Sequence, residues 1–232
     1  PAPALDEQKR IAEILSAFDE KIENNNRIIK TLEEIAQAIF KKQFNVPVDD
    51  LPAGWEISNV GAVANNHDSK RVPLSSMERA KRKGNIPYYG ANGILDYVDE
   101  ALFSGEYVLF AEDGTVKTEK STPVIFLVNG DFWVNNHAHI VSGKKVSNYF
   151  LYLSLRNIPV DQYITGGVQP KITQQNLNSI PLLLPPETIL AEFETITQPI
   201  KEKLQLIEKE NQKLAAMRDL LLPKLMSGEI RV

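Results

Sequence analysis

The chain has 232 residues, of which 43% are hydrophobic, and no cysteine, so it can bury a core but holds no disulfide, thiolate metal ligand or cysteine nucleophile. No apolar run reaches the roughly 18 residues of a membrane span, and no secretory signal opens the chain, so we expect a cytoplasmic protein without a membrane partner. The net charge of −4 comes from the two ends of the chain, because residues 51–180 hold 12 basic and 12 acidic residues.

Residues 1–46 predict one long helix that packs as a coiled coil. Asp6 can cap its start by accepting hydrogen bonds from free backbone N–H groups. Apolar residues then recur at alternating spacings of four and three, which is the pattern of a coiled-coil seam. The predicted seam consists of Ile11, Leu15, Phe18, Ile22, Asn25, Ile29, Leu32, Ala36 and Ile39. Asn25 is its one polar member, and a single asparagine in a seam can fix register and partner choice at a cost in stability.

Residues 47–182 predict a β-rich domain. Strand composition occurs at residues 55–57, 60–63, 105–110, 124–128 and 132–134, and residues 148–156 favour a helix. Asn129-Gly130 predicts a hairpin turn between the last two of these strands. Gly90, Asn92-Gly93 and Gly166-Gly167 mark further turns.

Residues 183–232 predict a second long helix that repeats the plan of the first. Ile11-Ala12-Glu13-Ile14 has a counterpart in Leu190-Ala191-Glu192-Phe193, and each follows a proline-containing entry. The predicted seam consists of Ile196, Ile200, Leu204, Ile207, Asn211, Leu214, Met217, Leu221 and Leu225. Pro199 should start or kink this helix, and Pro223 should kink or end it near Leu222, so Leu225 is the weakest member of the seam. Gly228 is the expected final stop.

The two helices are expected to pack antiparallel, because the first leads into the middle domain and the second leads out of it. In the best register the numbers of facing residues sum to 236, as for Leu15 and Leu221, and Phe40 faces Ile196. This register places Asn25 opposite Asn211, where two amides can satisfy each other. We predict that this pair sets the register. The alternative is that each helix packs on another subunit. Together the segments predict an α+β fold.

A local basic cluster would be the best candidate for phosphate contacts if the domain binds nucleic acid. It consists of Lys70, Arg71, Arg79, Lys81, Arg82 and Lys83, among which Glu78 is the only acidic residue. An arginine in such a cluster can also read the edge of a guanine. The alternative is an ordinary solvated loop.

Three further groups would be candidates for contact with nucleic acid. Tyr88, Tyr89 and Asn92 lie in a glycine-containing loop, where the asparagine amide suits adenine and the tyrosines can equally pack in the core. Lys117, Thr118 and Lys120 form a second polar loop. Gln169 and Lys171 follow Gly166-Gly167, which can let backbone amides approach a phosphate or simply form a tight turn.

Enzymatic sites are not indicated. His137 and His139 alternate, so on a strand they would face one side, and Glu112 and Asp113 could join them around a metal ion. No third ligand is placed by spacing, so we expect hydrogen-bonded interior roles, no metal and no cofactor. The chain has no nucleophile elbow, P-loop, dinucleotide fingerprint or methyltransferase glycine loop, which predicts a non-catalytic protein.

Several stretches, in order along the chain, resemble one known family. They are LDEQKRIAEIL (5–15), LPAGWEISNVGAVA (51–64), GNIPYYGANGILDYVDE (84–100), GEYVLFAEDG (105–114), FWVNNHAHIVSG (132–143) and GGVQPKITQQNLNSIPLLLPP (166–186). All are similar to type I restriction–modification specificity subunits, and residues 51–64 look like the opening of a target recognition domain. The resemblance covers nearly the whole chain.

The resemblance implies a subunit that is not catalytic and reads half of a bipartite target in double-stranded DNA. Its conserved-region helices would space two recognition domains and dock the methyltransferase subunits, with a restriction and translocase subunit joining through the complex. The family has two recognition domains and this chain has one, as in a natural half-size subunit or half of a full one. A second copy would complete the site and predicts a homodimer with a palindromic split target. The alternative function is a helical oligomerisation scaffold that presents a protein- or ligand-binding domain.

Overall fold

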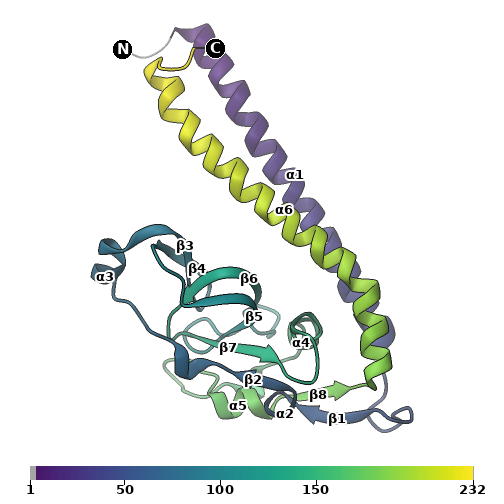
Figure 1. Cartoon of the computed structure of the whole chain (residues 1–232). Helices are drawn as coiled ribbons and strands as arrows, with labels where there is room; N and C mark the ends of the chain where they lie inside the picture. The colour runs from purple at the N-terminus through teal and green to yellow at the C-terminus, as the bar shows by residue number, and fades with distance from the viewer. Residues whose placement is uncertain (1–3, 232) are drawn as a thin grey trace. The chain divides into compact units, whose positions relative to one another are not determined.

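The computed structural model describes residues 4–231, and the chain divides into two compact units, Pro1–Lys41 with Thr195–Val232, and Lys42–Glu194. The first unit is formed by two long helices, α1 (Leu5–Phe44) and α6 (Glu187–Ser227), which lie antiparallel along each other (Figure 1). The predicted α+β fold with an antiparallel coiled coil is confirmed. Among the described residues, no helix is long and apolar enough to cross a membrane.

The seam of α1 lies where the sequence predicts it. All nine of its members are buried or half-buried, whereas Ile28 and Ile35, just outside the seam, are exposed. The 4–3 spacing produces this result because it keeps one stripe of the helix facing its partner over the whole length.

The predicted seam of α6 is wrong at two positions. Ile196 and Met217 are 48% and 51% exposed, and their neighbours Thr197 and Arg218 are buried and half-buried in their place. With this correction the seam of α6 also alternates by four and three, and Thr197 replaces Ile196 opposite α1, facing Ile39 rather than Phe40. The prediction preferred apolar residues, but a long arginine can cover a seam with its stem while its guanidinium reaches out. The Nη1 atom of Arg218 lies 2.6 Å from the Oδ1 atom of Asp19.

Helix α6 continues through both of its prolines. It ends at Ser227, so of the two outcomes predicted for Pro223, a kink or an end near Leu222, the end is wrong, and Leu225 is only 2% exposed. Although a proline removes one helical hydrogen bond, burial of Leu225 in the turn after Pro223 helps to offset that loss. Gly228 ends the helix as predicted, with φ of +75° and its N–H donating to the carbonyl of Leu225 at 3.2 Å.

The buried centre of the coiled coil is polar. The Nδ2 atom of Asn25 donates to Oδ1 of Asn211 and to Oε2 of Glu210, both at 2.8 Å. The Nδ2 atom of Asn211 donates in turn to Oδ1 of Asn26 at 2.9 Å. The two amides therefore lie opposite each other, as the predicted register requires, and are joined by one hydrogen bond, while Asn26 and Glu210 complete the polar contacts.

We expect Asn25→Leu to lower the free energy of unfolding by about 1–3 kcal/mol, because it leaves Oδ1 of Asn211 without the donor that Asn25 supplies. The double substitution Asn25→Leu with Asn211→Leu should restore stability but allow several registers. The cysteine-free background makes this measurable by disulfide cross-linking of Leu32→Cys with Leu204→Cys, two residues that face each other in the native register. Unchanged cross-linking in the double variant would mean that the asparagines do not set the register.

The second unit is a β-rich domain with a six-stranded sheet in the order β2-β7-β5-β6-β3-β4 and a separate pair, β1-β8. The strands are β1 (Glu56–Asn59), β2 (Ala64–Asn66), β3 (Lys83–Gly90), β4 (Gly93–Val98), β5 (Phe103–Ala111), β6 (Ile125–Val134), β7 (Ala138–Gly143) and β8 (Pro181–Leu184). The short helices are α2 (Val60–Val63), η1 (Asp68–Lys70), α3 (Ser76–Lys81), α4 (Asn148–Leu155), η2 (Asp161–Tyr163) and α5 (Gln174–Ser179). All strand pairs are antiparallel except β3 with β6.

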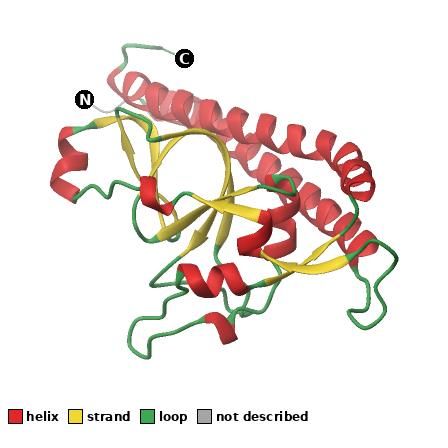
Figure 2. Ribbon diagram, turned by 60° about the horizontal axis from the view of Figure 1, so that its bottom comes forward, coloured by secondary structure: helices red, strands yellow, loops and turns green. Residues whose placement is uncertain are grey.

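The predicted hairpin turn at Asn129-Gly130 is wrong, because β6 passes through it as one strand. Gly130 pairs directly with Gly105 of β5, and both glycines have positive φ, +100° and +117°. Glycine tolerates this conformation, so both strands bend together without losing their pairing. Figure 2 shows the resulting strong curvature of the sheet. Residues 60–63 also differ from expectation, since they form α2, which is capped by the side chain of Asn59.

An aromatic cluster anchors the ends of the long helices in this domain. Phe44 at the end of α1 packs edge-on against Phe150 of α4 and against Phe193 of α6, each with ring centroids 5.1 Å apart. All three side chains are buried. The domain core therefore includes the last turn of α1 and the first turns of α6.

Candidate functional site

A buried network of charges ties together four segments of the domain. Arg71 follows η1, Glu112 follows β5, His139 lies in β7, and Lys171 precedes α5. The Nη1 atom of Arg71 lies 2.5 Å from Oε2 of Glu112, whose Oε1 atom is 2.9 Å from Nζ of Lys171. Asp68 completes the network, with its Oδ2 atom 2.5 Å from Nδ1 of His139.

The two carboxylates of the network are held ionised. Burial raises the pKa of Asp68, but the hydrogen bond and charge of His139 outweigh it, so that this pKa lies below its ordinary value. Burial likewise raises the pKa of Glu112, but its hydrogen bonds to Arg71 and Lys171 outweigh that effect, so this pKa also lies below its ordinary value. The hydrogen bond to Glu112 raises the pKa of Lys171. The network therefore stabilises the bases of the surrounding loops through paired charges.

The potential metal ligands of the network are engaged by other groups of the chain. Asp68, Glu112 and His139 offer ligand atoms within 4.8 Å of one another. However, Arg71 and Lys171 already occupy Glu112, and both ring nitrogens of His139 are bonded, Nε2 lying 2.8 Å from the carbonyl oxygen of Ile172. These partners supply the positive charge that a metal ion would otherwise provide.

His137 and His139 do not share one face, so the prediction that they alternate on a strand is wrong. Strand β7 begins only at Ala138, which leaves His137 in the preceding loop. The ring of His137 is 48% exposed and lies 2.6 Å from Asp113, whereas the side chain of His139 is 1% exposed.

The predicted basic cluster is largely neutralised by acidic residues. Arg71 is committed to the buried network and is not available to DNA. Arg79 lies 3.2 Å from Asp96 and stacks over the ring of Tyr88. Arg82 lies 3.0 Å from Asp99 and 2.5 Å from Glu100, and stacks over Trp133.

Three lysines of the cluster are more accessible. Lys83 is exposed but lies 2.6 Å from Asp96, and its hydrogen bond is the main cause that lowers the pKa of that carboxyl to about 2. Lys70 and Lys81 are exposed and form no ion pair with any residue in the described range 4–231. These two remain the freest cations of the predicted cluster.

The tyrosines have structural roles. Tyr88 is fully buried, and its hydroxyl oxygen accepts a hydrogen bond from the backbone N–H of Leu74 at 2.9 Å. Its predicted contact with DNA is therefore wrong, because the side chain has no exposed surface. Tyr89 is half-buried and packs edge-on against Phe132.

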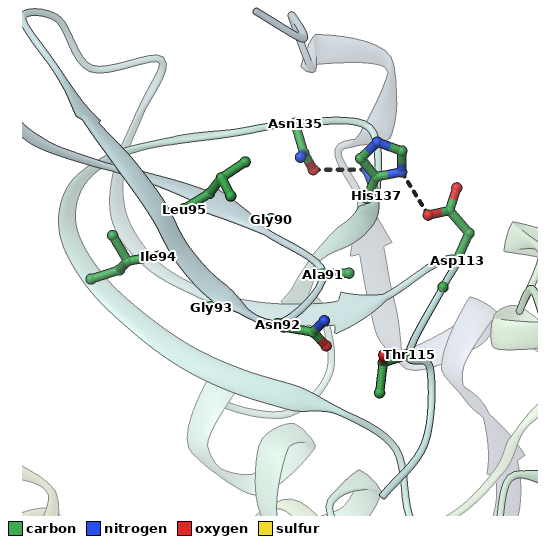
Figure 3. A pocket seen from close by; sticks show the side chains of 11 residues that line it. Gly90, Ala91, Asn92, Gly93, Ile94, Leu95, Asp113, Thr115, Asn135 and His137 are labelled. Carbon is green, nitrogen blue, oxygen red and sulfur yellow. Dashed lines mark hydrogen bonds and ion pairs between the residues drawn. The ribbon is translucent and has the colours of Figure 1, made fainter. Parts of the chain in front are cut away.

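Polar loops gather at the turn of the β3–β4 hairpin, around a pocket of about 370 Å³ (Figure 3). The pocket is lined by the β3–β4 turn, the loop after β5 and the β6–β7 loop. Its lining residues are Gly90, Ala91, Asn92, Gly93, Ile94, Leu95, Asp113, Gly114, Thr115, Asn135 and His137. Of the predicted residues, the pocket includes Asn92, which is exposed.

The loop at residues 165–171 lies beside this pocket. The backbone N–H of Gly114 donates to the carbonyl oxygen of Pro170 at 3.1 Å. Gly166 has φ of +86°, and a Cβ atom there would lie 2.3 Å from the carbonyl oxygen of Gln169, so the tight turn requires glycine. The turn leaves the side chain of Gln169 exposed, whereas Lys171 is bonded to the network.

The second predicted polar loop borders a neighbouring pocket. Lys117 lines this pocket and forms an ion pair with Asp161. Thr118 forms a hydrogen bond with Thr122 at 2.8 Å, and Lys120 is exposed without an ion pair among residues 4–231. The structure thus brings Asn92, Lys117 and Gln169 to one end of the domain.

Asn135 and His137 are pocket residues that the DNA-binding prediction did not include. Asn135 lies between two strands that are far more apolar, in the run Asn135-Asn136-His137. This polar interruption is the signal that marks them. The interior role predicted for His137 is wrong, because its ring is 48% exposed.

The comparisons with known proteins agree on one family. The family model described as "Type I restriction modification DNA specificity domain" matches residues 1–34 and 52–216. A protein of Haemophilus influenzae assigned as a type I restriction enzyme specificity subunit is 42% identical over 132 residues, which is 56% of this chain and 33% of that protein. The MjaIX type I restriction enzyme specificity subunit of Methanocaldococcus jannaschii is 27% identical over 267 residues, which is 100% of this chain and 60% of that protein.

The fold has solved counterparts. The crystal structure of a type I restriction–modification S subunit from M. genitalium has a TM-score of 0.64 at 20% identity, over 96% of this chain and 61% of that one. This chain thus spans between a third and three fifths of the curated relatives named above. Because the family model covers both long helices and the β-rich domain, the chain belongs to the type I restriction–modification DNA specificity family.

Proposed function

We propose that this chain is a DNA sequence-specificity subunit of a type I restriction–modification complex and reads one half of a bipartite target. The observation that supports it best is the family match at residues 1–34 and 52–216, which includes parts of both long helices and the β-rich unit Lys42–Glu194. We call this β-rich unit the reader domain. The exposed polar loops around the pocket supply groups suited to base edges and phosphates. The proposed partners are double-stranded DNA, methyltransferase subunits docked on the helices and, through the complex, a restriction and translocase subunit, all in the cytoplasm.

We also propose that the chain is not itself an enzyme and acts as two copies. The carboxylates of Asp68 and Glu112 are bonded to His139, Arg71 and Lys171, which gives them a structural role. One reader domain covers one half-site, so a bipartite site needs a second. Two copies related by a two-fold axis would read a palindromic split target.

The salt dependence of DNA binding tests the proposed function. We expect the assembled complex to lose affinity steeply with salt, and Lys70→Ala with Lys120→Ala to weaken binding similarly for all sequences. If each lysine contacts one phosphate, each substitution should reduce the slope of log K against log salt by about 0.9. Fluorescence anisotropy over a range of salt concentrations measures both effects.

A matched control is available on the same domain. Lys144 and Lys145 are exposed and follow the end of β7 that is opposite to His137. Lys144→Ala with Lys145→Ala should leave the slope unchanged. Binding without salt dependence in the unaltered complex would contradict DNA reading and favour the alternative, a scaffold that presents a protein- or ligand-binding domain.

A further inference from the structure

The pocket at the β3–β4 turn holds polar groups whose orientation is fixed by their own neighbours. Asn135 is the most buried of them, at 6% exposure. Its Oδ1 atom accepts the backbone N–H of His137 at 2.8 Å, and its own backbone N–H donates to the carbonyl oxygen of Tyr89 at 3.0 Å. The bond to Tyr89 holds the backbone of Asn135, and the bond from His137 orients the amide so that Oδ1 points toward the backbone of His137.

The amide nitrogen of Asn135 is left as a donor. It has no hydrogen-bond partner among residues 4–231, and Figure 3 shows Asn135 among the residues that line the pocket. A Cβ atom on Gly90 would lie 3.4 Å from this nitrogen, so the glycine keeps that side open. This donor is therefore open to the pocket and can bond an acceptor supplied from outside the chain.

His137 provides a group of the opposite kind. Its Nδ1 atom lies 2.6 Å from Oδ1 of Asp113. Because a carboxylate only accepts hydrogen bonds, Nδ1 carries a proton, and in the tautomer with its single proton on Nδ1 the ring presents Nε2 as an acceptor. The half-exposed ring leaves Nε2 without a partner in the described part of the chain. The exposed amide of Asn92 adds one further donor and one acceptor.

We infer that this pocket reads the edge of an adenine in the major groove, with Asn135 donating to N7 and His137 accepting from the N6 amino group. Adenine is the one base that presents an acceptor beside a donor there, whereas guanine presents two acceptors, cytosine a donor, and thymine an acceptor and a methyl group. Asn92, on the exposed turn, can add contacts to the same base pair. The inference rests on the proposed function and names the specificity-determining residues of the reader domain.

Asn135→Asp tests the donor with little change in shape. The aspartate keeps an oxygen toward the N–H of His137 but replaces the free donor with an acceptor. The assembled complex would be used to select binding sequences from a random double-stranded DNA library. We expect preference for adenine to fall roughly 5- to 150-fold at one position of the half-site, with the other positions unchanged. Asn136→Asp is the matched control, because Asn136 is the exposed neighbour and does not line the pocket.

Base analogues test the same contacts without relying on a variant that must fold. In the selected sequence, each adenine would be replaced in turn by 7-deazaadenine, which lacks the N7 acceptor, or by purine, which lacks the N6 amino group. The unaltered complex should lose binding with both analogues at one position. Asn135→Asp should be indifferent to 7-deazaadenine there, and His137→Phe should be indifferent to purine.

The outcomes separate the inference from the proposed function. Selection of no sequence by the unaltered complex would overturn both. A clear target that Asn135→Asp leaves unchanged, or one in which the analogues have no effect at any adenine, would overturn the inference alone. Relaxation at a position that is not adenine would also overturn it, since the donor–acceptor pair would then read another base.

Discussion

Arg71→Ala should lower the free energy of unfolding by about 3–5 kcal/mol, because it removes the buried cation that pairs with the carboxylates of Glu112 and Asp68. The side chain of Arg71 is 14% exposed, and its guanidinium also donates to the backbone carbonyl of Ala138 at 2.9 Å. The network joins the loops that border the pocket, so the variant should lose DNA binding together with stability. Urea denaturation followed by tryptophan fluorescence measures the first effect.

Arg82→Ala is the matched control for this prediction. Its partners Asp99 and Glu100 are 51% and 69% exposed, so solvent screens the pairs and the loss should be much smaller than for Arg71→Ala. The cost of Arg71→Ala should also shrink at low pH. Burial raises the pKa of Glu112, but its hydrogen bonds to Arg71 and Lys171 hold the folded pKa below the unfolded value, so the stabilisation is present above the unfolded value and is lost as pH falls through the folded one. Equal losses for the two arginine variants at neutral pH would contradict a structural role for the network.

Inserting one heptad into each long helix should lengthen the unspecified gap of the bipartite target by about three base pairs. Seven residues add about 10.5 Å to a helix, and DNA rises about 3.4 Å per base pair. Placing the insertions after Ile29 in α1 and before Ile207 in α6 keeps both seams in phase, because these residues face each other in the native register. Sequencing of methylated sites measures the gap.

An insertion in α1 alone is the informative control. It shifts Asn25 away from Asn211 by about two helical turns, so the hydrogen bond of 2.8 Å between them is lost and the complex should assemble poorly. An unchanged gap in the double insertion, with methylation retained, would mean that the helices do not set the spacing between half-sites.

The coiled coil was predictable because its determinants are local and repetitive. One turn of helix places each seam residue of α1 relative to the next, so the apolar period alone identifies Ile11 through Ile39. Applied strictly to α6, the same 4–3 alternation places Thr197 and Arg218 in the seam. Apolarity alone favours their neighbours Ile196 and Met217, which are exposed. Here period was a better guide than residue type.

The reader domain was less predictable because its decisive contacts are between segments far apart in the chain. Asn129-Gly130 has the composition of a turn, but the facing Gly105 allows the pair to bend as continuous strands. Arg71 was grouped with neighbouring cations, although Glu112, 41 residues away, determines its role.

The sequence by itself determined the two long helices, their antiparallel register and the family. Only the tertiary structure decided which polar side chains are available to a ligand. Availability depends on whether a distant partner already satisfies a group, as Glu112 does for Arg71 and none does for the amide nitrogen of Asn135 among residues 4–231. Periodicity records which face of an element is buried, but the pairing of buried charges and donors is fixed only when strands and loops from separate parts of the chain meet.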